Sequence, residues 1–376
     1  MRYLLSVPLA GLMMFSGCGQ FFPPITSTGG GGTGSNTGDY LYVANSSTSL
    51  NTVAGFSIGT KLTTTASSPY DIGATPTAVA ITPNNEFLYV ASLTDGAIFG
   101  YAVNSNGSLT ALNSGSPLVT GVAPEALKVD TTGNWLVMAD LSPTAYVFSV
   151  DSSTGILTQS SSAAVGLTAG VPGKIAFTPA DNLVFIALGS GGVNVLSFDS
   201  STGVISADQK LASGVSSGVS LNDTSLAVSP NGNFLFVTET GGTGVKALTI
   251  SSSGVLTPIT GSPFATGLGP NDVLVDSTGA YVYVANRTDG TISAFTLDST
   301  TGKLTAIAGS PFATGSEPSS LAEDNTHAYI AVANAGGNSD LQVFKIDTTT
   351  LGALDAFTTA TTGTDPTGAF QVVATN

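Results

Sequence analysis

The chain has 376 residues, a length that fits two average domains or one repetitive all-β unit. Only 9% of the residues are charged, against about 25% in an average globular protein, and glycine, serine and threonine are abundant, which favours short strands and tight turns. An excess of 24 acidic over 9 basic residues, with arginine only at positions 2 and 287, argues against nucleic acid as a partner and against a phosphate clamp.

The first eighteen residues are predicted to be a targeting signal. A basic start at Arg2 precedes an apolar stretch over residues 3–15 that is too short to span a bilayer. The run from Phe15 to Cys18 resembles a bacterial lipobox, although Phe15 stands where leucine is usual; an ordinary signal peptide with an incidental cysteine is the alternative. We therefore expect lipidation of Cys18 and a protein of the cell envelope that is anchored to the membrane through its N-terminal lipid.

The residues after the cysteine refine this expectation. Gly19 stands where an aspartate is often linked to inner-membrane retention, so the outer membrane is favoured. Residues 19–38 are rich in Gly, Ser, Thr and Pro and are predicted to form a flexible tether. Cys18 is the only cysteine, so an intramolecular disulfide is impossible.

Seven copies of one strand pattern follow the tether. Aromatic or aliphatic residues recur within segments that begin at residues 40, 87, 135, 183, 234, 281 and 329, so consecutive copies start 47 to 51 residues apart. A period this constant indicates an internally repeated architecture.

Each period is predicted to hold four strands. A second strand follows the first, as at 98–103 and 292–297, and a third, shorter strand begins at the word Gly-x-Leu-Thr, as at 107–110 and 302–305. A loop with the word Gly-Ser-Pro leads to a fourth strand that opens after a proline, as at 76–81 and 270–275, and that should be innermost. Four strands in about 48 residues are typical of a β-propeller blade.

The ends of the chain are expected to interlock. The first repeat begins at Tyr40 without its inner strand, whereas residues 366–373 form an inner-type strand without a repeat of its own. The sequence therefore predicts one all-β domain over residues 39–376, a seven-bladed β-propeller with four antiparallel strands per blade, closed by the C-terminal strand joining the N-terminal blade.

Strand direction assigns the loops to two faces of the ring. Loops that enter inner strands share one face, called here the entry face, with loops that follow the first strand of each repeat pattern. We expect a ligand at a funnel on this face. Its polar candidates are Asp95, Glu125, Glu239, Asp272, Asn286, Arg287, Asp289, Glu317 and Asp365. For Arg287 the alternative is a surface ion pair with Asp289.

Charges also fall on the inner strands themselves. Lys128 and Lys174 stand where other repeats carry uncharged residues, and Glu323 replaces an apolar residue, so these side chains must be hydrated in a channel or paired. Both lysines are candidate ligand-binding residues, with a hydrated channel of compensating charges as the alternative. His327, the only histidine, lies in a turn on the opposite face, so imidazole catalysis is not expected.

No metal or cofactor is expected either. A zinc site built from several His and Cys is excluded by the single histidine and the single cysteine. Calcium held by carboxylates and carbonyls, for instance near Asp289, stays open, although no dense Asp-x-Asp loop favours it.

The repeated words Tyr-Val-Ala-Asn, Gly-x-Leu-Thr and Gly-Ser-Pro-Phe resemble those of the bacterial β-propeller lactonase family, which includes the 6-phosphogluconolactonase type and is related to YVTN-repeat surface proteins. The resemblance covers residues 39–373. It implies hydrolysis of a sugar lactone by acidic, basic and imidazole groups at the mouth of the ring. The chain departs from this pattern in its single arginine after the signal and in the position of His327, so a carboxylate, Glu125 or Asp272, is the expected general base.

Two functions remain open on the sequence. The first is a noncatalytic binding or scaffold module of the cell envelope that takes a protein or glycan partner, which the tether and the sparse catalytic equipment favour. The second is a lactonase-like hydrolase that opens a small sugar lactone at the axial funnel. In both, Arg287, Asn286, Asp289, Glu239, Glu317, Lys128 and Lys174 are the candidate ligand-binding residues.

Overall fold

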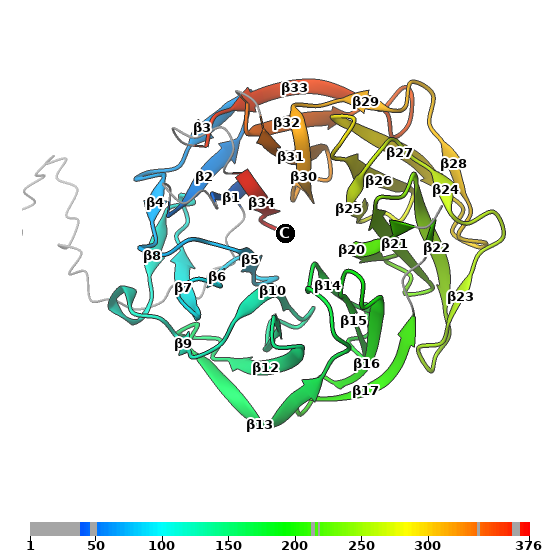
Figure 1. Ribbon diagram of the computed structural model, residues 1–376. Helices are drawn as coiled ribbons and strands as arrows, with labels where there is room; N and C mark the ends of the chain where they lie inside the picture. Colours follow the sequence, from blue (N-terminus) through cyan, green and yellow to red (C-terminus); the bar gives the residue numbers. More distant parts are fainter. Residues whose placement is uncertain (1–37, 46–50, 212–214, 217–218, 337–338, 363–368) are drawn as a thin grey trace, which may run out of the picture. The chain divides into compact units, whose positions relative to one another are not determined.

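The computed structural model describes residues 38–45, 51–211, 215–216, 219–336, 339–362 and 369–376. The predicted signal segment with Cys18, residues 19–37 of the predicted 19–38 tether, and Asp365 lie outside these residues. The described chain forms seven antiparallel sheets arranged in a ring around a central axis, with one short 3-10 turn at Asn113–Gly115 (Figure 1). Within the described residues, no helix has the length and apolar character needed to cross a bilayer. The predicted seven-bladed all-β propeller is confirmed.

The first three blades are built from strands in the order inner to outer. Blade 1 holds β34 (Ala369–Ala374), β1 (Tyr40–Asn45), β2 (Thr52–Ile58) and β3 (Leu62–Thr64). Blade 2 holds β5 (Ala78–Ile81), β6 (Phe87–Ser92), β7 (Ala97–Val103) and β8 (Leu109–Ala111). Blade 3 holds β10 (Pro124–Val129), β11 (Trp135–Asp140), β12 (Thr144–Val150) and β13 (Leu157–Gly166).

The remaining blades repeat this order. Blade 4 holds β14 (Ile175–Phe177), β15 (Leu183–Ala187), β16 (Val193–Asp199) and β17 (Val204–Leu211). Blade 5 holds β20 (Asn222–Val228), β21 (Phe234–Thr240), β22 (Gly244–Ile250) and β23 (Leu256–Pro258), and the hairpin β18 (Val215–Ser216) with β19 (Val219–Ser220) precedes it. Blade 6 holds β25 (Pro270–Val275), β26 (Tyr281–Asn286), β27 (Thr291–Leu297) and β28 (Leu304–Ala306), and blade 7 holds β30 (Ser316–Glu323), β31 (Tyr329–Gly336), β32 (Leu341–Ile346) and β33 (Leu354–Ala360).

The ring closes through the C-terminal strand, as the sequence predicted. β34 pairs antiparallel with β1, in a register that places Val43 opposite Val372 and Leu41 opposite Ala374. These residues belong to one buried cluster that joins blade 1 to blade 7, and Val372 is 3% exposed. Closure therefore covers the inner edge of β1, which would otherwise present unpaired backbone groups.

The repeated words mark contacts between neighbouring blades. The hydroxyl of Tyr42, on β1, donates to the carbonyl of Gly107 in the next blade at 2.8 Å, and Tyr89 makes the equivalent bond to Gly155 at 2.9 Å. Gly107 has φ of 74°, and a Cβ there would lie 2.3 Å from the ring of Tyr40. The glycine of Gly-x-Leu-Thr is thus required both by its positive φ and by an aromatic ring packed on its α-carbon.

The Gly-Ser-Pro segments differ from the sequence expectation. They are not only loops, because each is followed by a two-residue strand that pairs with β7, β22 or β27: β9 (Val119–Thr120), β24 (Phe264–Ala265) and β29 (Phe312–Ala313). In blade 1, β4 (Tyr70–Asp71) pairs with β2 in the same way after a Ser-Ser-Pro segment. Phe264 and Phe312 pack against the buried clusters of their blades. Partial burial of these aromatic side chains holds the segment beside the sheet, where its backbone pairs with the neighbouring strand.

Candidate functional site

One position on the seven inner strands forms a belt around the axis. The register aligns Ala78, Ala126, Lys174, Ser225, Asp272, Ser320 and Gln371, and we call this set the axial belt. Four of its polar members, Ser225, Asp272, Ser320 and Gln371, bond to the backbone of the next inner strand. Gln371 Oε1 accepts from the N–H of Val79 at 2.7 Å, and Asp272 Oδ2 accepts from the N–H of Leu321 at 2.7 Å. The belt therefore couples neighbouring blades at the axis.

Asp272 and Lys174, both predicted site residues, meet in this belt. Lys174 Nζ lies 2.6 Å from Asp272 Oδ1, and the side chains are 29% and 6% exposed. Asp272 Oδ1 also accepts from the hydroxyl of Ser225 at 2.5 Å and from the N–H of Val273 at 2.9 Å. With four donors around it, Asp272 is held as an ion-paired acceptor. It can position the Lys174 ammonium, whereas taking a proton from water would require breaking these bonds.

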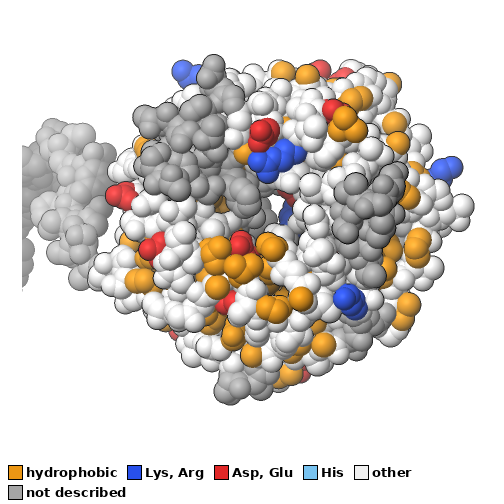
Figure 2. Space-filling model, in the orientation of Figure 1, with side chains coloured by type: hydrophobic (Ala, Val, Ile, Leu, Met, Phe, Trp, Pro, Cys, Tyr) orange, Lys and Arg blue, Asp and Glu red, His pale blue; other side chains and the backbone are white. Residues whose placement is uncertain are grey.

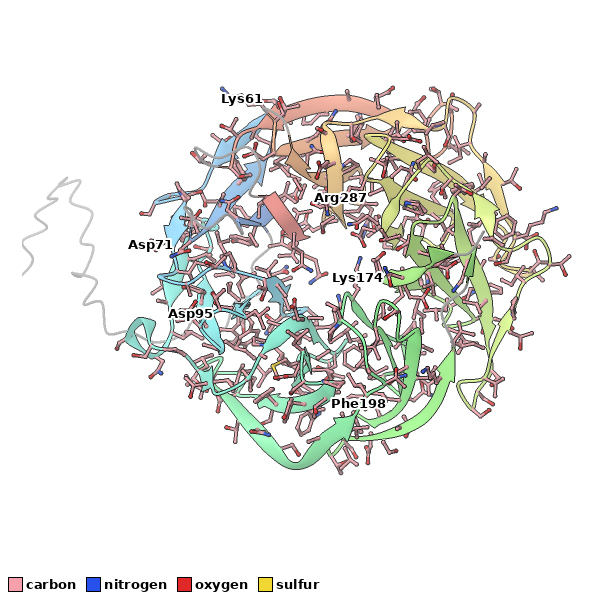
Figure 3. The ribbon with its side chains drawn as sticks, viewed as in Figure 1. Lys61, Asp71, Asp95, Lys174, Phe198 and Arg287 are labelled. Carbon is pink, nitrogen blue, oxygen red and sulfur yellow. The ribbon has the colours of Figure 1, made fainter. Side chains whose placement is uncertain are left out.

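A cavity opens above the belt on the entry face. Its volume is about 430 Å³, and its lining comes from blades 4 to 7 and from β34. Figure 2 shows the central opening at this face, and Figure 3 shows Lys174 and Arg287 near it, with Asp95 farther from the axis. The lining residues used below are Lys174, Asp272, Asp223, Thr224, Asn271 and Ser319. Hydroxyl, amide and ionic groups around one cavity suit a small, hydroxyl-rich ligand.

Glu125 stands at a β-bulge that recurs around the ring. The pairing of β10 with β11 skips Glu125, and the equivalent pairings skip Thr224, Asn271 and Ser319, all three of which line the cavity. Bulges of this kind re-aim a side chain at the end of a strand. Glu125 is the acidic member of this set. Its strand β10 lies beside β14, the strand that Lys174 precedes (Figure 1).

The carboxylate of Glu125 is partly buried and has no hydrogen bond or ion pair among the described residues. Burial raises the pKa of this carboxyl above its ordinary value. Glu125 is not part of the cavity lining, but it stands at the bulge position that lines the cavity in blades 5, 6 and 7. A partly desolvated, unengaged carboxylate has the properties of a general base. Glu125 and Asp272, the two candidates for the general base, thus lie in different environments.

Glu239 lies in a buried ionic cluster below the entry face. Lys246 Nζ is 2.5 Å from Glu239 Oε1 and 3.0 Å from Asp223 Oδ1. The three side chains are 17% exposed or less. Lys246 was not singled out from the sequence, because its position on β22 carries no repeat word. The cluster holds Asp223 in place where it lines the cavity.

Asn286 is fully buried at the end of β26. Its Nδ2 donates to the hydroxyls of Thr291 at 3.0 Å and Ser293 at 2.9 Å. Asn45 and Asn334, at the same position of blades 1 and 7, are also fully buried. Asn286 therefore organises the turn after β26 within its own blade, whereas Asn45 also bonds to Thr362, which follows β33 of blade 7.

Arg287 pairs with Glu317, not with Asp289. Arg287 Nη2 lies 2.8 Å from Glu317 Oε2, and the side chains are 43% and 52% exposed. Asp289 Oδ2 instead accepts from the N–H of Leu268 at 2.7 Å and orders the loop that enters β25. The ion pair between Arg287 and Asp289 that the sequence left open as an alternative is therefore wrong. Asp289 accepts from the backbone of Leu268, and Arg287 pairs with Glu317. Arg287 lines the rim of the cavity.

The axis is also hollow below the belt, where a second cavity of about 430 Å³ includes Lys128. At the far mouth, Glu323 accepts from the N–H of Ser277 at 2.8 Å, and the hydroxyl of Ser277 lies 2.9 Å from His327 Nδ1. Glu323 Oε1 lies 3.4 Å from the same ring nitrogen. A Ser-His-acid arrangement for catalysis uses both ring nitrogens, so this contact set is not one.

Within the described ranges, no three His, Cys, Asp or Glu side chains gather so as to hold a metal ion.

Comparisons with known proteins agree with this geometry. The family model described as "Lactonase, 7-bladed beta-propeller" matches residues 33–313. No curated protein is detectably similar in sequence. Among solved structures, a proposed 6-phosphogluconolactonase from Bacteroides uniformis has a TM-score of 0.70 and 20% identity, with 85% of this chain and 95% of that chain covered. The periplasmic gluconolactonase PpgL of Pseudomonas aeruginosa has a TM-score of 0.67 and 16% identity, with 90% and 99% covered. At such identities the two structures show a shared fold.

Proposed function

Because the chain belongs to the seven-bladed β-propeller lactonase family, we propose that it binds a small sugar lactone in the entry cavity and hydrolyses the ring ester. The observation that carries this proposal is the difference between the two candidate carboxylates. Glu125 is unengaged and has a raised pKa, while Asp272 holds the ammonium of Lys174 at 2.6 Å. Glu125 and Lys174 belong to neighbouring blades whose inner strands are in contact, so these blades can supply a base and a cation.

The proposed reaction assigns one role to each group. Glu125 takes a proton from water as the water oxygen attacks the lactone carbonyl carbon. The carbonyl oxygen gains negative charge, which the ammonium of Lys174 stabilises from a position fixed by Asp272. The ring C–O bond then breaks, and the leaving alkoxide takes the proton from Glu125, which gives an open-chain hydroxy acid.

A noncatalytic binding module is the second candidate. It is favoured by the engagement of the carboxylates that line the cavity itself, since Asp223 is bonded to Lys246 and Asp272 to Lys174. Such a module would hold a sugar or glycan end in the same cavity through hydroxyl and amide groups, without turnover.

The test is hydrolysis of a panel of aldonolactones by the purified protein, measured as acid release at constant pH. We expect turnover above the buffer rate and a loss of about a hundredfold or more in kcat for Glu125→Gln, the usual contribution of a general base. Glu86→Gln is the matched control, because Glu86 lies in a turn on the opposite face and bonds to Asn84. Turnover unchanged in Glu125→Gln would remove Glu125 from the mechanism, and binding of lactones without turnover would favour the binding module.

We also propose that the protein works at the cell envelope, held by a lipid on Cys18. The support is the signal-like segment and the run from Phe15 to Cys18. A Cys18→Ser variant is expected to leave the membrane fraction and to lose incorporation of radiolabelled palmitate. Retention of label by the variant would contradict lipidation at this residue.

A further inference from the structure

The axial channel carries an unusual ring of side chains one level beyond the belt. The register aligns Ala80, Lys128, Ala176, Ala227, Leu274, Ala322 and Val373, and all seven line the cavity below the belt. Six of the seven are apolar. Lys128 therefore places its ammonium group in an otherwise apolar girdle.

Lys128 has no compensating charge in this girdle. Among the residues that the structure describes, it makes no ion pair and no hydrogen bond. Glu323, at the far mouth, is engaged by Ser277 and by His327. Surrounding protein, and then the positive charge of Lys174, lower the pKa of Lys128. Lys128 is nonetheless exposed to solvent in the channel, so an anion that enters the channel can reach its ammonium group.

The two lysines lie at consecutive levels of adjacent inner strands. Lys174 lines both the entry cavity and the lower cavity, as do Ser320 and Gln371, so the belt is the point where the two cavities meet. Asp272 pairs with Lys174, while Lys128 has no such partner. The belt and the girdle therefore hold two ammonium groups and one carboxylate, which pairs with Lys174 alone. The positive charge of Lys128 lies one level beyond the belt.

We propose that the axial channel binds the carboxylate of a sugar acid between Lys128 and Lys174, with the hydroxylated part of the molecule in the entry cavity. The acid is the open-chain product of the proposed lactone hydrolysis, and only this choice of ligand rests on the proposed function. Two separate ammonium groups can bind a carboxylate as point charges, and a carboxylate is the group that hydrolysis of the lactone ester creates. The hydroxyls and amides of Thr224, Asn271 and Ser319 suit the polyol chain.

The test uses sodium gluconate as the probe, with binding measured by isothermal titration calorimetry. We expect saturable binding to the wild-type protein and affinity at least tenfold weaker for Lys128→Met, as for the loss of one charge-assisted contact. Lys128→Arg should retain part of the affinity. Lys303→Met, at an exposed turn, is the matched control and should bind as wild type does. Sorbitol, which has the hydroxyls without the carboxylate, should bind at least tenfold more weakly than gluconate.

Thermal unfolding distinguishes a loss of gluconate binding from a loss of folding in Lys128→Met. A methionine suits an apolar girdle, so Lys128→Met should unfold at the wild-type temperature or above it. At the same concentration, gluconate should raise the melting temperature of the wild type more than that of Lys128→Met. Equal gluconate binding by wild type and Lys128→Met, or no binding by either, would overturn the inference. Lactone turnover without gluconate binding would overturn only this inference, while gluconate binding without turnover would overturn only the proposed function.

Discussion

Replacing Val372 by alanine perturbs the closure of the ring at one buried side chain. Val372 is 3% exposed, lies opposite Val43 on β1 and packs in the cluster that joins blades 1 and 7. The substitution removes two carbon atoms, which at about 0.8 kcal/mol each lose about 1.6 kcal/mol of hydrophobic stabilisation. Incomplete collapse of the resulting space raises the expected loss to about 1.5–3 kcal/mol.

Equilibrium unfolding in urea, followed by circular dichroism, measures this loss. Val255→Ala is the matched control, because Val255 is 47% exposed and its truncation should change the unfolding free energy by less than about 0.5 kcal/mol. Deleting residues 366–376 is the stronger version, since it uncovers the whole inner edge of β1 and should lower both melting temperature and protease resistance. Equal effects of the two valine substitutions, or a truncated chain with wild-type stability, would refute closure by β34.

Three further predictions concern charged groups. Asp272→Asn should lower the unfolding free energy by about 2–4 kcal/mol, because the amide cannot accept from all four donors of the buried carboxylate; wild-type urea stability would contradict this. Burial, and then the negative charge of Asp324, raise the pKa of Asp39 to about 7, so the folded state keeps a proton that the unfolded state releases near pH 4. The contribution of Asp39 to the unfolding free energy is complete below about pH 4 and is lost as the pH rises to about 7. Asp39→Asn should therefore flatten the pH dependence of urea unfolding between these values. A pH profile equal to that of the wild type would contradict the raised pKa of Asp39. Glu317→Gln should change stability by less than about 1 kcal/mol, since its pair with Arg287 is exposed; a larger loss in the same assay would show that the pair is worth more than its exposure implies.

The fold could be predicted from the sequence because each blade carries its own short motifs for turns and for contacts with the next blade. Gly107 needs a positive φ and contact with the ring of Tyr40, so its word recurs wherever that contact recurs. Closure by β34 also followed, since a repeat that lacks its inner strand must obtain one from elsewhere in the chain. The short strands after Gly-Ser-Pro were missed because two-residue pairings leave no periodic pattern.

The site was accessible only in part. Glu125 and Asp272 were singled out as acidic residues in loops of the entry face, and Lys174 because it interrupts a column of uncharged residues. The structure brings Asp272 and Lys174 together. The different environments of the two carboxylates could not be predicted, because three of the four donors around Asp272 come from other blades. The partner of Arg287 depends likewise on the placement of blade 7 beside blade 6, which sequence spacing does not encode.

A crystal structure of the protein with gluconate tests the central claim most directly. The proposed function and the axial carboxylate site together predict one gluconate on the ring axis, with its carboxylate within about 3 Å of the ammonium groups of Lys128 and Lys174. Its hydroxyls should contact the lining of the entry cavity. Gluconate bound at the periphery of the ring, or on the axis with its carboxylate directed away from both lysines, would contradict the account.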